Sequence, residues 1–157
     1  MLKKYLFIFF LSMVPVIELR GAIPFAVNWE LDYWTALTVC AIGNMLPVPI
    51  IYLFARKVLH WGADKKYIGK FFRFCIEKGE RGGQKLTARA GRGGLFVSLM
   101  LFVGIPVPGT SAWTGTVAAS FLNMGIRSTV TAVSLGVVIA GIIMGVASTG
   151  VFSIFGI

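Results

Sequence analysis

Residues 15–24 read PVIELRGAIP and interrupt an apolar block that runs from Tyr5 to about Trp29. Glu18 and Arg20 are the only charged residues inside this block. A charged side chain at the centre of a membrane helix costs roughly 2.5–3.5 kcal/mol, so it is retained where it faces protein or water. A proline at each end of the stretch opposes an uninterrupted helix. The stretch therefore predicts a broken helix with a polar site at its break.

The composition indicates that this block lies in a membrane. Of the 157 residues, 57% are hydrophobic and 13% are charged, against roughly 45–50% and 25% in soluble domains. A soluble fold of this size has too small a core to bury so much apolar surface. A second block, residues 33–55, is apolar throughout and would span about 34 Å as a helix, enough to cross a bilayer. We therefore predict an all-α integral membrane protein.

The same order of blocks occurs twice along the chain. A second interrupted block, residues 95–123, contains the break IPVPGTSAWTG at 105–115, and a plain apolar block, residues 128–157, follows it. This order predicts an inverted two-fold repeat, in which each half is a re-entrant, broken helical hairpin (5–29 or 95–123) plus one transmembrane helix (33–55 or 128–157). A single crossing in each half inverts the second half relative to the first, as in many transporters.

Four plain transmembrane helices with proline kinks are the alternative topology. Lys3 and Lys4 favour it, because positive residues prefer the cytoplasm and a strict first hairpin would leave them outside. No small-x-small cleavage site follows the N-terminal apolar stretch, so we do not expect a cleaved signal peptide.

A basic segment separates the two halves. Between Arg56 and Arg92 lie eleven of the fifteen basic residues and three acidic ones. The positive-inside rule then predicts a cytoplasmic loop at 56–94, with its basic part (56–92) on the cytoplasmic side of a multi-pass protein of the cytoplasmic (inner) membrane. Within a single membrane domain over 1–157, residues 64–78 have apolar residues at helical spacing. They predict an amphipathic helix, either on anionic headgroups or against the protein itself.

Glu18 and Arg20 are the first candidate site residues. Spaced two apart, they would point to different sides of a regular helix, but a broken backbone could bring both into one pocket. We expect Arg20 to hold an anionic group and Glu18 to take and release a coupling proton. A structural salt bridge or a snorkelling pair is the alternative. Pro24 marks a place where a new helix could begin.

The second break has no charge but many hydrogen-bonding groups. Its two prolines prevent helix continuation and its glycine allows unusual dihedral angles. Thr110 or Ser111 could cap a new half-helix, whose N–H groups and dipole would favour a phosphate or a carboxylate. The candidate residues here are Pro106, Pro108, Gly109, Thr110, Ser111 and Trp113.

Outside the two breaks, Asn44 places an amide at membrane depth. It is expected to bond to one of the breaks, as a structural clamp or as a substrate contact. Gly141 and Gly145 have the spacing of close helix packing. His60 has no second metal ligand at suitable spacing, and no nucleotide-binding loop or nucleophile elbow occurs. We expect no metal, no cofactor and no enzymatic activity.

Three segments together resemble the putative small multidrug export family: PVIELRGAIP at 15–24, GNMLPVP at 43–49 and IPVPGTSAWTG at 105–115. The resemblance covers nearly the whole chain, although the family usually has Gly where this chain has Ser111. The family is similar in architecture to the DedA-like (VTT-domain) membrane proteins. That similarity implies two re-entrant hairpins facing each other and movement of polyprenyl phosphate or phospholipid. The resemblance implies a central site lined by Glu18, Arg20, Pro24, Pro106, Pro108, Gly109 and Thr110.

The sequence thus predicts a small, ion-coupled transporter that works by alternating access between two broken hairpins. Its substrate is an amphipathic drug or a lipid phosphate, and the uncharged second break favours the phosphate. Expected partners are membrane lipids, protons or another coupling ion, and a second copy that shields the breaks from lipid. Nucleic acid is not expected, since no nucleic-acid motif accompanies the basic segment. The alternatives are a non-transporting assembly or scaffold protein and, third, a lipid-phosphate enzyme, which lacks clustered catalytic residues.

Overall fold

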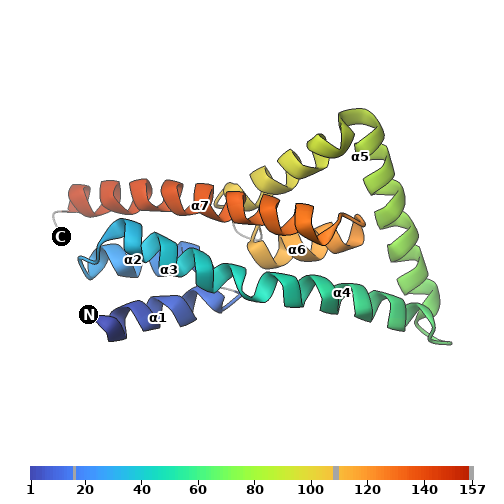
Figure 1. The fold of residues 1–157 in the computed structure, drawn as a ribbon, viewed down its shortest axis with the longest axis horizontal. Helices are drawn as coiled ribbons and strands as arrows, with labels where there is room; N and C mark the ends of the chain where they lie inside the picture. Colours follow the sequence, from blue (N-terminus) through green and yellow to red (C-terminus); the bar gives the residue numbers. More distant parts are fainter. Residues whose placement is uncertain (16, 108–109, 156–157) are drawn as a thin grey trace.

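The computed structural model describes residues 1–15, 17–107 and 110–155 (Figure 1). Among these residues there are helices and no strands, so the prediction of an all-helical chain is confirmed for them. The helices are α1 (Leu2–Met13), α2 (Glu18–Asn28), α3 (Tyr33–Met45), α4 (Pro47–Ala63), α5 (Gly69–Gly104), α6 (Ala112–Phe121) and α7 (Ile126–Phe155).

The first broken block forms two helices, α1 and α2, that lie side by side (Figure 1). Val14 precedes Pro15 and is extended, with φ −74° and ψ 127°, because a residue before proline avoids the helical region. The helix therefore breaks after Met13, and Val14, Pro15 and Ile17 are here called the first tip. The expectation that a new helix begins at Pro24 is wrong, because α2 already begins at Glu18 and contains Pro24.

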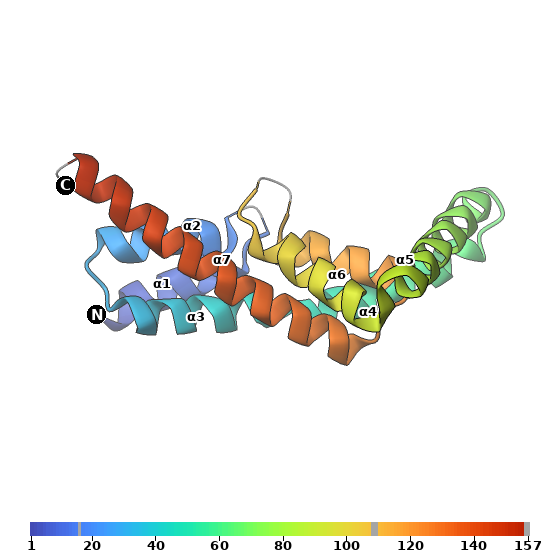
Figure 2. The same ribbon diagram turned by 90° about the horizontal axis from the view of Figure 1, so that it is seen from above.

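The second broken block has the same local causes. Ile105 precedes Pro106 and is extended (φ −79°, ψ 118°), which ends α5. Residues 105–107 and 110–111, here called the second tip, precede α6, whose N-cap is Ser111. The Ser111 hydroxyl accepts from the Thr114 N–H at 3.1 Å and the Thr114 hydroxyl accepts from the Ser111 N–H at 2.8 Å, which makes a capping box. The predicted start of a half-helix is confirmed, and the two tips lie next to each other (Figure 2).

The helices α2 and α6 end in the same way. Glu30 and Asn123, just beyond their last residues, have left-handed backbones with φ 54° and 55°. The N–H groups of Leu31 and Met124 then bond to the carbonyl oxygens five positions earlier, at 3.0 Å in both cases. This is the Schellman motif, which closes a helix and reverses the chain. In both places the chain continues into a long helix.

Two helical stretches, Tyr33–Ala63 and Ile126–Gly150, are long and apolar enough to cross a membrane. The first joins α3 to α4 through Leu46, which keeps helical dihedrals (φ −58°, ψ −43°). A proline in the first turn of α4 is tolerated, so the helix predicted at 33–55 extends further. This stretch and α7 run in opposite directions along the molecule (Figure 1). Their outer faces carry exposed apolar side chains, such as Phe54 (67% exposed) and Val146 (70%).

The segment predicted as a loop at 56–94 is more helical than expected. Here α4 continues to Ala63 and α5 begins at Gly69, so residues 69–78 of the predicted amphipathic helix 64–78 are helical. Residues 64–68 are not, because they form the turn between α4 and α5. A bend at Gly91, with φ 71°, divides α5 into two legs, residues 69–90 and 92–104. Glycine adopts this left-handed angle without a steric penalty, so the chain turns there and the second leg points towards the first tip.

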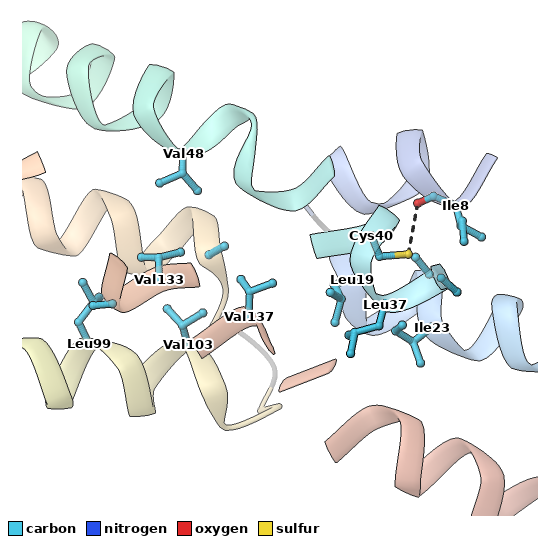
Figure 3. Close-up of a cluster of buried hydrophobic side chains, with 14 of the residues drawn as sticks. Ile8, Leu19, Ile23, Leu37, Cys40, Val48, Leu99, Val103, Val133 and Val137 are labelled. Carbon is cyan, nitrogen blue, oxygen red and sulfur yellow. Dashed lines mark hydrogen bonds between the residues drawn. The ribbon is translucent and has the colours of Figure 1, made fainter. Parts of the chain in front are cut away.

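The core joins the two halves. Its buried side chains include Leu19, Ile23 and Leu37 on one side and Val103 and Val133 on the other (Figure 3). Side chains of α3 pack directly on the α7 backbone at two glycines: the Tyr33 hydroxyl donates to the Gly141 carbonyl at 3.1 Å, and a methyl group on Gly145 would overlap the Tyr33 ring. The two glycines therefore serve packing within one chain.

Candidate functional site

Arg20, in the first turn of α2, reaches across to the second tip. Its Nη1 donates to the Val107 carbonyl at 2.7 Å. Its Nη2 lies 3.1 Å from the Val103 carbonyl and 3.3 Å from that of Ile105, and it also donates to the Thr110 carbonyl and lies 3.2 Å from the Thr110 hydroxyl oxygen. The last carbonyls of a helix and of the turn after it have no partner within the helix. Arg20 supplies that partner from the other hairpin.

This set of bonds, here called the Arg20 clamp, holds the two tips together. The Thr110 hydroxyl strengthens the turn, since its oxygen also lies 2.7 Å from the Ile105 carbonyl and 2.8 Å from the Val107 carbonyl. The predicted role of Arg20 as an anion-binding residue stays a prediction. In this structure its N–H groups are directed at carbonyl oxygens, so an anion would have to displace them.

Glu18 begins α2 with an unusual backbone, φ 51°, in the left-handed region. Left-handed dihedrals cost a non-glycine residue roughly 1–2 kcal/mol and are retained where the surroundings impose them. Its side chain is 2% exposed and faces the start of α6, interacting with the Ser111 side chain and with the N–H groups of Ala112 and Trp113. The arrangement places a carboxyl group at the positive end of a helix dipole.

Glu18 and Arg20 do not form a close ion pair. Among the described residues the ion pair found is Glu77–Arg81, at 3.9 Å on exposed positions of α5. The two site residues diverge because Arg20 turns to the carbonyls of the second tip, whereas Glu18 turns to the N–H groups of α6. Thus α2 supplies a donor, Arg20, to the carbonyl groups after the end of α5, and an acceptor, Glu18, to the N–H groups at the start of α6.

Asn44 joins this site from α3. A small cavity of about 10 Å³ is lined by Glu18, Arg20 and Asn44, and this is close to the space that one water needs. Asn44 is 3% exposed. Its Oδ1 and the Oε1 of Glu18 are both buried without a hydrogen-bond partner among the described residues. Both atoms are acceptors, so a proton, a water or a small cation would satisfy them.

The other predicted residues lie at different distances from this cavity. Ser111 and Thr110 take part in the tip contacts described above, and Trp113 has a buried indole N–H without a described partner. Pro106 follows the extended Ile105 and shapes the turn. Pro24 lies inside α2 and is not among the residues that line the cavity. Pro108 and Gly109 lie outside the described residues.

Sequence reasoning missed the carbonyl groups of Val103, Ile105 and Val107. A signal for them was present: a helix that stops before a proline leaves carbonyls without partners, and an arginine in a nearby break is the donor that suits them. It also missed Val137 and Ala140 of α7, which line the cavity as ordinary apolar residues of a long helix.

A protein-family model with the description "Putative small multi-drug export protein" matches residues 18–143. The matched range contains Glu18, Arg20, Asn44 and the whole second break, and it leaves out α1. No curated protein and no solved structure matches the chain.

Proposed function

Because the chain belongs to the family described as "Putative small multi-drug export protein", we propose that it is a small, ion-coupled transporter of the cytoplasmic membrane. Its site lies between the two tips, and its substrate is an amphipathic molecule with a phosphate group, such as a lipid phosphate. The main support is the Arg20 clamp beside the buried Glu18 carboxyl. A membrane protein that buries Glu18 and half-buries Arg20 between its helices retains both charges against a substantial cost.

The proposed topology is an inverted repeat of two re-entrant hairpins. Several local features recur in both halves and support it. Val14 and Ile105 both end a helix before a proline, and Glu30 and Asn123 both reverse the chain through the same motif. The long helices that follow run in opposite directions (Figure 1). Glu18 and Ser111 open the second helix of each hairpin and face each other, as residues beside a two-fold axis do.

The proposed coupling ion is a proton carried by Glu18. An ionised carboxylate without full hydrogen bonding is costly in an apolar cavity, whereas a carboxylic acid is far less so. A protonated Glu18 could donate to the Asn44 Oδ1, which satisfies the two acceptor oxygens described above. Release of this proton on one side of the membrane and uptake on the other would drive the cycle.

The proposed substrate group is a phosphate held by Arg20 and by the N–H groups at the start of α6, which Glu18 would release when it takes up its proton and turns to Asn44. A guanidinium binds phosphate through two parallel bonds, and the N–H groups of a helix start favour the same charge. Binding would exchange the carbonyl oxygens of the second tip for phosphate oxygens, and the tips would then separate. This exchange is the proposed alternating-access step. In a homodimer, a second copy would shield the opened tips from lipid.

Transport by purified protein in proteoliposomes tests the proposal. We expect the wild-type protein to move a fluorescent polyprenyl phosphate in response to a pH gradient, Glu18→Gln to lose the response to pH, and Arg20→Ala to lose at least nine-tenths of the rate. Glu30→Gln, which changes an exposed carboxylate outside the site, is the matched control. If the protein moves neither this lipid nor a cationic drug, the chain is better explained as a scaffold. If both site variants transport normally, the proposed site is wrong.

Cysteine accessibility tests the topology separately. Single cysteines at positions 18–24 and 106–115 should react with impermeant reagents from opposite faces of the membrane. Reaction of both ranges from one face only would support four kinked helices in place of the inverted repeat.

A further inference from the structure

A groove of about 890 Å³ lies at the far end of α6 from the Glu18 cavity. It is open to one side and is lined by residues from both legs of α5 and from the turn between α6 and α7. Figure 1 shows the angle between the two legs. Small-molecule sites commonly have volumes of roughly 300–1,000 Å³, so the groove has the size of a ligand site. Because α6 has ten residues, its length separates the two places by about 15 Å.

Two arginines give the groove its charge. Arg92 comes from the second leg of α5 and Arg127 from the first turn of α7, and both side chains are exposed. Neither guanidinium has a hydrogen-bond or ion-pair partner among the described residues, whereas Arg20, Arg56 and Arg73 all donate to protein oxygens. Glu80, the acidic residue that also lines the groove, is on the other leg of α5. Two cations without a described partner, against one carboxylate on the other leg of α5, favour an anion.

The groove also has an apolar part, beside the polar side chains of Gln84, Asn123 and Ser128. Leu95 and Met124 are buried at its base, and Leu122 is half-buried beside them. A free inorganic anion would gain nothing from this surface. An amphipathic anion would gain from both parts, because its charged group could lie between the arginines while its apolar part covers the leucines.

The position of the groove matches the level of lipid headgroups. It adjoins the first residues of the apolar stretch Ile126–Gly150, which is long enough to cross a membrane. The end of such a stretch lies where hydrocarbon gives way to headgroups. At the same end of the molecule, Trp61 lies under the Lys65 ammonium group at 4.4 Å, a pair suited to the membrane interface.

We propose that this groove binds a phospholipid with an anionic headgroup, such as phosphatidylglycerol. The phosphate lies between Arg92 and Arg127, near the N–H groups at the start of α7, and the first carbons of the acyl chains lie over Leu95 and Leu122. This lipid site is separate from the proposed transport site and does not depend on it.

Binding of fluorescent phosphatidylglycerol to the purified full chain in detergent tests the proposal. We expect the double variant Arg92→Gln/Arg127→Gln to weaken binding at least tenfold. Arg89→Gln, which removes an exposed arginine of the same helix that does not line the groove, should change binding less than twofold. Undiminished binding by the double variant would overturn the proposal. An equal loss in the Arg89 variant would also overturn it, because it would reveal attraction by overall charge.

Competition distinguishes the lipid from a simple anion. Unlabelled phosphatidylglycerol should displace the probe, while inorganic phosphate and glycerol phosphate should do so at least a hundredfold less well. If either small anion competes as well as the lipid, the groove is an anion site and the lipid proposal fails. The replaced side chains are exposed, so the melting temperature should stay at the wild-type value. Glu18→Gln should bind the lipid normally, so failure of transport and failure of this site can be told apart.

Discussion

Replacement of Arg20 by alanine tests whether the Arg20 clamp stabilises the fold. The Nη2 atom carries two N–H groups, so its several contacts share two hydrogens. The guanidinium therefore makes about three full-strength bonds with the end of α5 and the second tip. A bond to a charged group contributes about 1.5–3 kcal/mol. The side chain is only half-buried, so water replaces part of this on removal, and we expect a loss of about 2–5 kcal/mol.

Thermal unfolding of the purified protein in detergent measures this loss. For a chain of this size, 1 kcal/mol corresponds to about 2–4 °C, so the melting temperature should fall by about 4–20 °C. Arg20→Lys should recover less than half of the loss, because one ammonium group cannot replace a planar fork of donors. Arg89→Ala, an exposed arginine with no partner among the described residues, is the control and should change stability by less than about 0.5 kcal/mol.

A double-mutant cycle locates the effect between the tips. Thr110→Val removes a hydroxyl that lies 3.2 Å from the Arg20 Nη2. The double variant should then lose less stability than the sum of the losses in Arg20→Ala and Thr110→Val, and the difference should be about 0.5–3 kcal/mol. If Arg20→Ala unfolds at the same temperature as Arg89→Ala, or if the two effects are additive, the clamp does not hold the tips and this reasoning is refuted.

Three further predictions concern the helix ends and the packing. Glu30→Gly should raise stability by about 1 kcal/mol, because glycine adopts the left-handed backbone at this position without a steric cost. Asn123→Gly should give no gain, because it also removes the hydrogen bond that Asn123 accepts from Arg56. A lower melting temperature for Glu30→Gly would contradict this. Gly145→Ala should destabilise the fold by about 1–3 kcal/mol, because the added methyl group would overlap the Tyr33 side chain. Gly93→Ala is the control and should not destabilise the fold, because a methyl group there meets open space. Equal melting temperatures for the two variants would show that α3 and α7 do not pack this closely. Hydrogen bonds from the Thr35 hydroxyl and from its N–H, in that order of size, lower the pKa of Asp32. The Asp32 cap therefore stabilises the protein fully above the ordinary aspartate pKa, and this stabilisation is lost as the pH falls through the lowered pKa. In Asp32→Asn the melting temperature should depend less on pH in this acidic range.

The positions of the breaks could be predicted because their causes are local. A residue before proline leaves the helical region whatever surrounds it, so Val14 and Ile105 end their helices. Ser111 could be recognised as a cap for the same reason, since its bonds reach only three residues along the chain. Pro24 misled because proline is also tolerated within a helix when the surrounding packing holds it. Pro15 had already broken the chain.

The partners of Arg20 could not be predicted from the sequence. They are backbone carbonyls more than eighty residues away, and every residue type carries a carbonyl. The sequence therefore indicates that Arg20 needs acceptors but not which ones. Asn44 was expected to lie near one of the breaks, and it does line the Glu18 cavity. Which group it meets there depends on how α3 packs against α2, which the sequence does not show. The lipid groove could not be foreseen either, because the bend at Gly91 creates it.

The strength of the Arg20 clamp also bears on which substrates the proposed transporter could accept. Moving a two-state equilibrium from 1:99 to 99:1 requires about 5.5 kcal/mol of differential binding. That is close to the upper part of the range expected for the clamp, so a substrate must replace most of the Arg20 bonds to separate the tips. A phosphate offers oxygen acceptors to the same N–H groups and can do this. A cationic drug offers none and would also meet the charge of Arg20. On this reasoning a cationic drug could open the tips only by acting through Glu18, and Arg20→Lys, with its weaker clamp, should accept a wider range of substrates than the wild-type protein.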